Sequence, residues 1–344
     1  MEECQICKRN VGDKKGSHIV PHFLIKRIDS ESEKKERDKE LGFIIEPNQT
    51  TSYFGRAVLP EKLEEIYGEI DDKLINENRI HGVVDYYFCS NCEKRLSVLE
   101  DVYSNTLKND VDPKEEYFST KESFIGFLFW VSIIWRLSIQ DGSGFKLKPK
   151  VEKRLGRIIN RYLQDKASDI KPEENDNDLH DIGYKILRSP NYSEKNATLM
   201  HWQPSYERPY SLMIDEFIVF LYMKNSYLKG MILDFYGSEK YKQDAPYNTP
   251  YDREKVLPIK HDDFQAIFTR VTNFAALIKL ETLNSNLDAI HRKLGGRGKY
   301  MNQKMKDEIK FKIAHSEEKL GKRHTIQEQS RIIFEVISKY HKVE

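Results

Sequence analysis

The four cysteines of this 344-residue chain form two pairs with the same spacing. Cys4 and Cys7 enclose two residues, as do Cys89 and Cys92, and no cysteine is left over. Two thiolates at this spacing can reach one ion from a tight turn, and four thiolates around one ion form the closed tetrahedral site of structural zinc. The sequence therefore predicts one structural zinc ion. The alternatives are unrelated buried cysteines, or a redox pair, which needs only one C-x-x-C and a βαβ setting.

The residues around these pairs indicate how the cysteines are positioned. The string Ser-His-Ile-Val-Pro at residues 17–21 follows the first pair and is typical of a short strand. After the second pair, apolar residues recur at helical spacing, so that pair is expected to open a helix. These apolar residues are Leu96, Leu99, Val102 and Tyr103. A cysteine turn, a hairpin, a second cysteine turn and a helix, in this order, predict a treble clef.

Residues 4 to about 105 resemble the HNH or ββα-metal endonucleases, whose fold is held by two C-x-x-C zinc turns. The string around His18 is similar to the histidine motif of that family. The resemblance implies that His18 is the general base and that Glu93, directly after the last cysteine, holds a catalytic Mg²⁺ or Mn²⁺. His22 or Asp85 is expected to assist Glu93 as a ligand. A neutral imidazole can take a proton from water, and carboxylate oxygens suit these ions.

The sequence departs from the family pattern in its metal shell and in its spacing. Many members have an acidic ligand where this chain has Ser17, and the intervening family Asn matches only Asp85 or Asn78. The 81 residues between the two cysteine pairs indicate an insertion at about residues 30–80.

Each of these polar residues also has a structural explanation that needs no catalysis. His18 and His22 could simply cap or pack within a small zinc fold. A carboxylate such as Glu93 is favourable in the first turn of a helix for dipole reasons alone. Glu100 lies on another face of the same predicted helix and is expected to be solvated.

The charge balance argues against a global attraction to nucleic acid. The chain has 56 basic and 55 acidic residues, a net charge of +1, so any such affinity must come from local patches. The best candidate is the stretch from Arg292 to Arg323, which has eleven Lys or Arg against four Asp or Glu. Its Gly-rich loop supplies the predicted phosphate contacts, which are Arg292, Lys293, Arg297 and Lys299. The alternative is a solvated helix face.

The remaining sequence predicts an α+β protein in which the zinc module is followed by a mainly α-helical body. Four segments are expected: the module at 1–112, a helical segment at 113–165, a linker or loop region at 166–200, and a mainly helical domain with short strands at 201–344. Helices are expected from Ser119, at 149–163, at 264–287, at 302–320 and from Thr325. Residues 217–222 and 231–236 are either two strands around a turn or, in the first half, a buried helix.

No segment of the sequence is typical of a membrane protein. The longest apolar run, 124–135, is too short to span a bilayer and predicts a buried helix. The first residues have no basic flank or apolar stretch of signal-peptide type, so a cytoplasmic location is expected. No membrane partner is predicted.

Two functions from different classes fit the sequence. The first is a metal-dependent HNH-type endonuclease that cuts DNA, or less favourably RNA. Its architecture is similar to that of anti-phage defence effectors, in which the helical body would bind a regulatory partner protein or a second copy of the chain. The second is a non-catalytic zinc protein that binds nucleic acid or a protein partner on a degenerate HNH scaffold.

Overall fold

The computed structural model describes most of the chain. The described residues are 2–24, 41–45, 50–54, 83–84, 86–107, 117–140, 144–196, 198–202, 207–229, 234–320 and 326–341. Among them, no helix combines the length and the apolar character needed to cross a bilayer. Helices and a mixed sheet are both present, so the predicted α+β class is confirmed.

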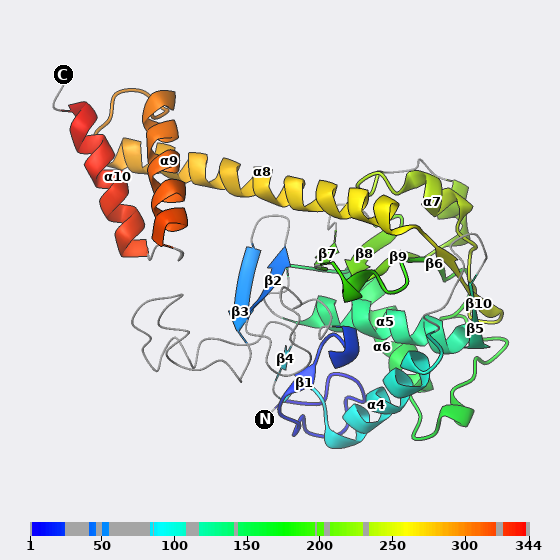
Figure 1. The fold of residues 1–344 in the computed structure, drawn as a ribbon. Helices are drawn as coiled ribbons and strands as arrows, with labels where there is room; N and C mark the ends of the chain where they lie inside the picture. Colours follow the sequence, from blue (N-terminus) through cyan, green and yellow to red (C-terminus); the bar gives the residue numbers. More distant parts are fainter. Residues whose placement is uncertain are drawn as a thin grey trace. The chain divides into compact units, whose positions relative to one another are not determined.

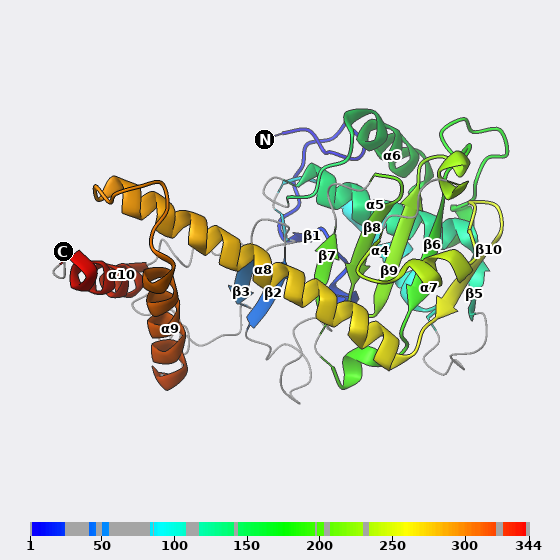
Figure 2. The same cartoon turned by 90° about the horizontal axis from the view of Figure 1, so that it is seen from above.

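The chain divides into two compact units. The first comprises Met1–Glu36, Leu41–Tyr53 and Ile80–Ala275, and the second comprises Arg37–Glu40, Phe54–Arg79 and Ala276–Glu344. The first unit contains the cysteines and the large sheet. Its strands and helices are shown in Figures 1 and 2.

The first unit is built on an eight-stranded mixed sheet with the order β3-β2-β7-β8-β9-β6-β10-β5. The strands are β2 (Leu41–Ile45), β3 (Thr50–Phe54), β5 (Tyr117–Glu122), β6 (Gly183–Arg188), β7 (Met200–Trp202), β8 (Tyr210–Ile214), β9 (Phe217–Tyr222) and β10 (Arg253–Pro258). β6, β7, β8 and β9 pair antiparallel with their neighbours in this group, whereas β10 runs parallel to β6 and β2 runs parallel to β7. A smaller sheet consists of β1 (Ser17–His18) and β4 (Val83–Val84).

The central strand β9 is buried on both faces. Phe217, Val219 and Leu221 belong to the core on one side of the sheet. Ile218, Phe220 and Tyr222 alternate with them and belong to the core on the other side. A strand covered on both faces reads as a continuous apolar run, so its sequence fits a buried helix nearly as well.

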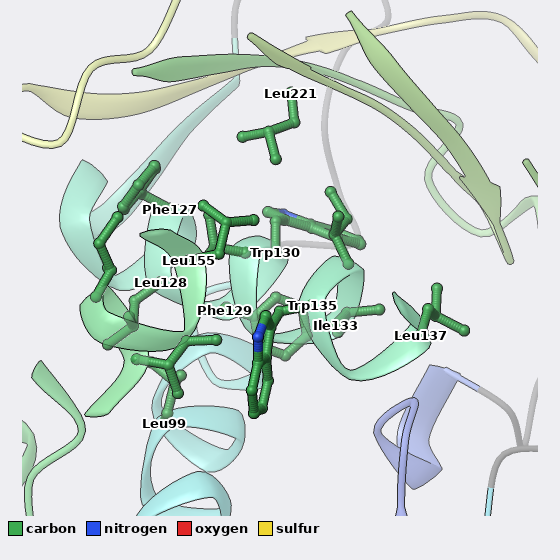
Figure 3. Close-up of a cluster of buried hydrophobic side chains, with 14 of the residues drawn as sticks. Leu99, Phe127, Leu128, Phe129, Trp130, Ile133, Trp135, Leu137, Leu155 and Leu221 are labelled. Atoms are coloured by element: carbon green, nitrogen blue, oxygen red, sulfur yellow. The ribbon is translucent and has the colours of Figure 1, made fainter. Parts of the chain in front are cut away.

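Three helices lie on one side of the sheet, with α5 directly against the strands. They are α4 (Ser90–Ser104), α5 (Ser123–Ile139) and α6 (Pro149–Tyr162). Figure 3 shows Phe127 and Trp130 of α5 below Leu221 of the sheet, with Leu99 of α4 on the far side of α5. Helix α5 is thus enclosed by the sheet and by other helices, which is why it is apolar on all sides, as predicted.

Helix α6 shows the narrower apolar stripe of a helix with one face in solvent. Its buried residues Leu155, Ile158, Ile159 and Tyr162 recur at helical spacing. The helix begins at Pro149, as expected, and ends within one residue of the predicted boundary. The predicted buried helix over residues 124–135 is also confirmed.

The opposite face of the sheet is covered by α7 (Glu239–Asp244) and by the first part of α8 (His261–Lys293). Phe264, Ile267 and Val271 of α8 belong to this second core. Figure 2 shows the N-terminal part of α8 crossing over the strands on this face. Residues 276–293 of α8 belong to the second unit.

The second unit contains α9 (Gln303–Leu320) and α10 (Ile326–His341) besides the end of α8. These helices enclose a small core of their own, which includes Leu287, Met301, Met305, Ile309, Val336 and Ile337. The helices predicted at 264–287 and 302–320 are confirmed. Thr325, the expected start of the last helix, lies outside the described residues, and α10 is described from Ile326.

Three predictions about secondary structure differ from the fold. Helix α5 begins at Ser123 rather than Ser119, because Tyr117–Glu122 pairs with β10 as strand β5. Sheet pairing here outweighs the local capping signal. Strand β9 pairs with β8 and β6. Residues 234–236 form no strand, and 231–233 lie outside the described residues.

The third difference concerns a segment expected to be a linker. The stretch 166–200, expected as a linker, contains β6, which lies inside the large sheet. The insertion expected at about 30–80 contributes β2 and β3, and Ile44 of β2 pairs with Met200 of β7. Both segments therefore take part in the sheet.

A buried carboxyl group joins α4 to the sheet. Glu254 of β10 accepts hydrogen bonds from the hydroxyls of Tyr184, at 2.6 Å, and Tyr103, at 3.3 Å. Tyr103 lies on α4 and accepts a bond of 2.9 Å from the indole of Trp130 on α5. At Gly126, a Cβ atom would lie only 2.0 Å from the Glu254 carboxylate, so glycine is required for this close approach.

The Glu254 carboxyl predicts a specific dependence of stability on pH. Burial raises the pKa of Glu254 from 4.5 to about 7, although both tyrosine hydroxyls oppose this shift. Because the folded state binds this proton more tightly, the stabilisation is complete below pH 4.5 and is lost as the pH rises to about 7. The difference is on the order of 3 kcal/mol.

Glu254→Gln keeps an oxygen for the tyrosines and has no charge. We expect its free energy of unfolding, measured with urea, to fall less between pH 5 and pH 8 than that of the wild type. Parallel pH profiles for the two proteins would contradict this role for Glu254.

Candidate metal centre and candidate active site

The first cysteine pair lies in a tight turn closed by backbone hydrogen bonds. The amide of Cys4 donates to the carbonyl of Asn10 at 2.8 Å, and the amide of Lys8 donates to the carbonyl of Cys4 at 2.9 Å. Lys8 has a φ of 53°, which turns the chain sharply after Cys7. This turn directs both thiols of the pair to the same side.

The second cysteine pair is held against the first by backbone contacts. The amide of Gln5 donates to the carbonyl of Tyr87 at 2.8 Å. At Gly12, a Cβ atom would lie 2.0 Å from the Tyr86 carbonyl oxygen, so only glycine permits the two segments to approach this closely. Cys89 is the N-cap of α4, and the predicted helix after the second pair is confirmed.

The four cysteines converge on one point, as the spacing predicts. Their sulfur atoms all lie within 4.8 Å of one another, and all four residues are buried. The Sγ atoms of Cys7 and Cys89 are 3.9 Å apart, close to the edge of about 3.8 Å that Zn–S bonds of about 2.3 Å give in a tetrahedron. All four thiols are free, so neither pair forms a disulfide.

The surroundings of the sulfurs suit a metal as well. The hydrogen bond between the Cys4 and Cys92 thiols lowers the pKa of Cys4 and raises that of Cys92, so Cys4 is the thiol of this pair that favours the deprotonated form, which metal ions bind. Asn10 donates its side-chain amide to the Cys89 sulfur at 3.6 Å, a contact that supports a ligating thiolate from outside the metal shell. The cluster could hold a metal such as zinc.

His18 lies in the two-residue strand β1, beside this cluster. β1 pairs antiparallel with β4, with Ser17 opposite Val84 and His18 opposite Val83. Ser17 is fully buried and the His18 side chain is half-buried. The predicted strand around His18 is therefore present, although it is short.

The carboxylate of Glu93 meets this histidine strand. Glu93 lies in the first turn of α4, where its amide donates to the carbonyl of Cys89 at 3.0 Å. Its half-buried side chain lies near the hydroxyl of Ser17, directly before His18, and this buried hydroxyl has no hydrogen-bond partner among the described residues. Burial raises the pKa of Glu93, whereas the nearby Ser17 hydroxyl and the charge of Arg136 act in the opposite direction. Residues from both sides of the cysteine cluster thus lie together.

A buried arginine links the same strand to α4. Arg136 of α5 donates from Nη1 to the carbonyl oxygen of His18 at 2.8 Å and forms an ion pair with Glu100 at 2.9 Å. The prediction that Glu100 is solvated is wrong, because its side chain is only 20% exposed and carries this ion pair. Burial raises the pKa of Glu100, against the influence of the Arg136 charge.

The other candidate ligands for a catalytic ion have different positions. The ring of His22 is exposed, and its centroid is 5.5 Å from that of His18. Asp85 and the alternative Asn78 lie outside the described residues. Within the described part of the chain, the four cysteines are the only group of three or more His, Cys, Asp or Glu side chains placed closely enough to share an ion.

The predicted basic loop lies in the second unit and consists of the last residues of α8 and the segment that leads to α9. Arg292, Lys293, Arg297 and Lys299 are all exposed there. The Arg292 side chain donates to the carbonyl of Lys299 at 3.0 Å, and His291 is bonded to the carbonyl of Arg297 at 3.1 Å. The loop therefore has a defined backbone, with four cationic residues on its surface.

Sequence reasoning missed Arg136 because it belongs to the apolar helix α5, outside residues 4–105. It is nevertheless the only charged residue in the 17-residue sequence of that helix. A lone arginine in an otherwise uncharged buried helix signals a fixed polar partner.

No family model matches the chain, and neither does any curated protein or solved structure at a significant level of similarity.

The geometry of the cysteines predicts about one tightly bound zinc ion per chain. Elemental analysis of the purified protein measures this directly. Cys89→Ser is expected to lose the zinc and to unfold the N-terminal segment, because the free energy of metal binding is coupled to folding.

Ser97→Ala, at an exposed position of the same helix, is the matched control and should keep the wild-type zinc content. Stoichiometric zinc in Cys89→Ser, together with a wild-type unfolding transition, would refute the four-cysteine site.

Proposed function

We propose that the chain is a metal-dependent endonuclease of the HNH type, which hydrolyses phosphodiester bonds in DNA or, as the less favoured substrate, RNA. One observation carries the proposal. The two cysteine pairs are separated by 81 residues in the sequence. The strand that holds His18 follows the first pair, the helix turn that holds Glu93 follows the second, and the two meet beside the cysteine cluster. A cysteine turn, a strand pair, a second cysteine turn and a helix follow in the order of a treble clef.

The residues divide the proposed reaction between them. His18 takes a proton from a water molecule, which a neutral imidazole can do near neutral pH. Glu93, with His22 and Asp85 as further donors, is the candidate ligand set for Mg²⁺ or Mn²⁺. Such an ion, when bound, stabilises negative charge on the phosphate and on the leaving oxygen. The zinc ion bound by the four cysteines has a purely structural role.

Substrate contacts are proposed at the basic loop of the second unit. Arg292, Lys293, Arg297 and Lys299 can approach phosphates because their side chains are exposed. Contacts of this kind depend on backbone charge and carry no sequence information. The combination of a small nuclease module with a large further body is similar in architecture to anti-phage effectors, and a regulatory partner or a second copy is proposed to bind that body.

A second function is favoured by one specific feature. Ser17 stands where many HNH members have an acidic ligand, and it lies near Glu93. If Glu93 serves only to fix the strand, the chain is a zinc-stabilised binding protein for nucleic acid or for a protein partner. Activity and binding measurements on the same variants separate the two functions.

Catalysis by His18 predicts a large loss of rate without loss of structure. His18→Ala should reduce cleavage of plasmid DNA by about 10²- to 10⁴-fold, the usual contribution of a general base. Glu93→Ala should regain part of its activity at high Mn²⁺, whereas His18→Ala should not respond to the metal. Cleavage of plasmid DNA and of structured RNA is measured with Mg²⁺, Mn²⁺ or EDTA.

His180→Ala is the matched control, since the His180 side chain is 77% exposed and lies in a loop of the same unit. It should cleave at the wild-type rate. Zinc content and thermal midpoint should stay unchanged in all three variants. A wild-type protein that binds nucleic acid but cleaves none under any condition would favour the binding function.

A further inference from the structure

Arg136 is a buried charge in the helix that separates the sheet from the cysteine module. Its side chain is 1% exposed, and no other residue in α5 is charged. Charged side chains are rarely buried unless their hydrogen bonds are satisfied. The partners of Arg136 therefore indicate what the charge is for.

The guanidinium group is fixed at its base and reaches two elements of the module. Nε donates to the carbonyl of Ser132 at 3.2 Å, and Nη2 donates to the Ser132 hydroxyl at 3.2 Å. Nη1 contacts both the His18 carbonyl oxygen, at 2.8 Å, and the Glu100 carboxylate, at 2.9 Å. One side chain thus connects the backbone of β1 to helix α4.

The two contacts set the position of β1 along α4. Glu93 and Glu100 are seven residues apart, so both lie on the same face of α4, about two turns from each other. β1 has two residues, and both pair with β4. The Arg136 contact to the His18 carbonyl holds the strand against this face.

We infer that Arg136, with Glu100, is a positioning pair for the proposed active site. The inference rests on the proposed function and extends it to a residue outside the module. A buried ion pair is weak evidence for stability, because the loss of hydration offsets much of the attraction between its charges. Its value here is orientation: the guanidinium fixes the backbone of the residue whose imidazole must meet the water.

The sheet supplies a matched pair for comparison. Arg188 and Glu216 form an ion pair of 2.6 Å, with side chains 1% and 0% exposed. Arg188 lies at the end of β6 and packs over the ring of Phe217, in the large sheet. The two arginines are equally buried and have the same chemistry, but Arg136 contacts the histidine strand whereas Arg188 lies in the large sheet.

The test uses charge-neutral double variants, because a single substitution would leave one buried charge unpaired and could unfold the protein. In Arg136→Met/Glu100→Gln both charges are removed and the donor to the His18 carbonyl is lost. We expect a near-native thermal midpoint and zinc content, kcat for DNA cleavage lowered about a hundredfold, and KM unchanged. Arg188→Met/Glu216→Gln should keep the wild-type kcat.

The single variant Arg136→Lys adds a rescue readout. It restores the charge opposite Glu100 with fewer donors, and its kcat should lie between those of the double variant and the wild type. A wild-type kcat in Arg136→Met/Glu100→Gln would overturn the inference. So would an equal loss of kcat in the Arg188 control, which would show a general effect of removing a buried pair.

A second measurement keeps the inference separate from the proposed function. If the wild type cleaves no DNA or RNA, the proposed function fails, and the ¹⁵N-imidazole NMR signals of His18 then decide the positioning role. These signals should be displaced in Arg136→Met/Glu100→Gln and unmoved in the Arg188 control. Coincident His18 signals in the wild type and both double variants would overturn the inference.

Discussion

The first unit depends on the convergence of two cysteine pairs that are separated by 81 residues in the sequence. Two short turns bury little apolar surface between them, and the four sulfurs are placed where one metal ion could join the turns. Once the sulfurs meet, the direction of α4 is set, because Cys89 is its N-cap and Cys92 lies in its first turn. The cluster therefore fixes both the turn that precedes the histidine strand and the helix turn that holds Glu93.

Helix α4 transfers this constraint to the rest of the unit. Its buried residues Leu96, Leu99 and Tyr103 face the core, and the Tyr103 ring stacks on Phe129 of α5 at 4.2 Å between centroids. Two buried polar contacts also fix the position of α4 relative to its neighbours. Glu100 pairs with Arg136 of α5, and Tyr103 donates a hydrogen bond to Glu254 of β10. Apolar contacts alone tolerate sliding, whereas such polar contacts require one register. The sheet and the candidate site are in this way joined through α4 and α5.

The sequence predicted local features and missed those that depend on distant partners. The cysteine spacing, the helical stripe of α6 and the apolar run of α5 each lie within a short window, and each appears in the fold. β9 was ambiguous because both of its faces are buried, which removes the alternation that marks a strand. The start of α5 was misplaced because β5 pairs with β10, more than a hundred residues away. The contact of Arg136 with the His18 carbonyl spans 118 residues and has no local signature beyond the isolated charge.

The central claim is that two different metal ions bind in neighbouring places, one for structure and one for chemistry. Crystals grown with Mn²⁺ and a non-cleavable DNA, measured on both sides of the zinc and manganese absorption edges, test it directly. The account predicts a zinc peak equidistant from the four cysteine sulfurs and a separate manganese peak at the Glu93 carboxylate. A zinc peak without any manganese at Glu93 would contradict the catalytic site, and absence of zinc from the four cysteines would contradict the account as a whole.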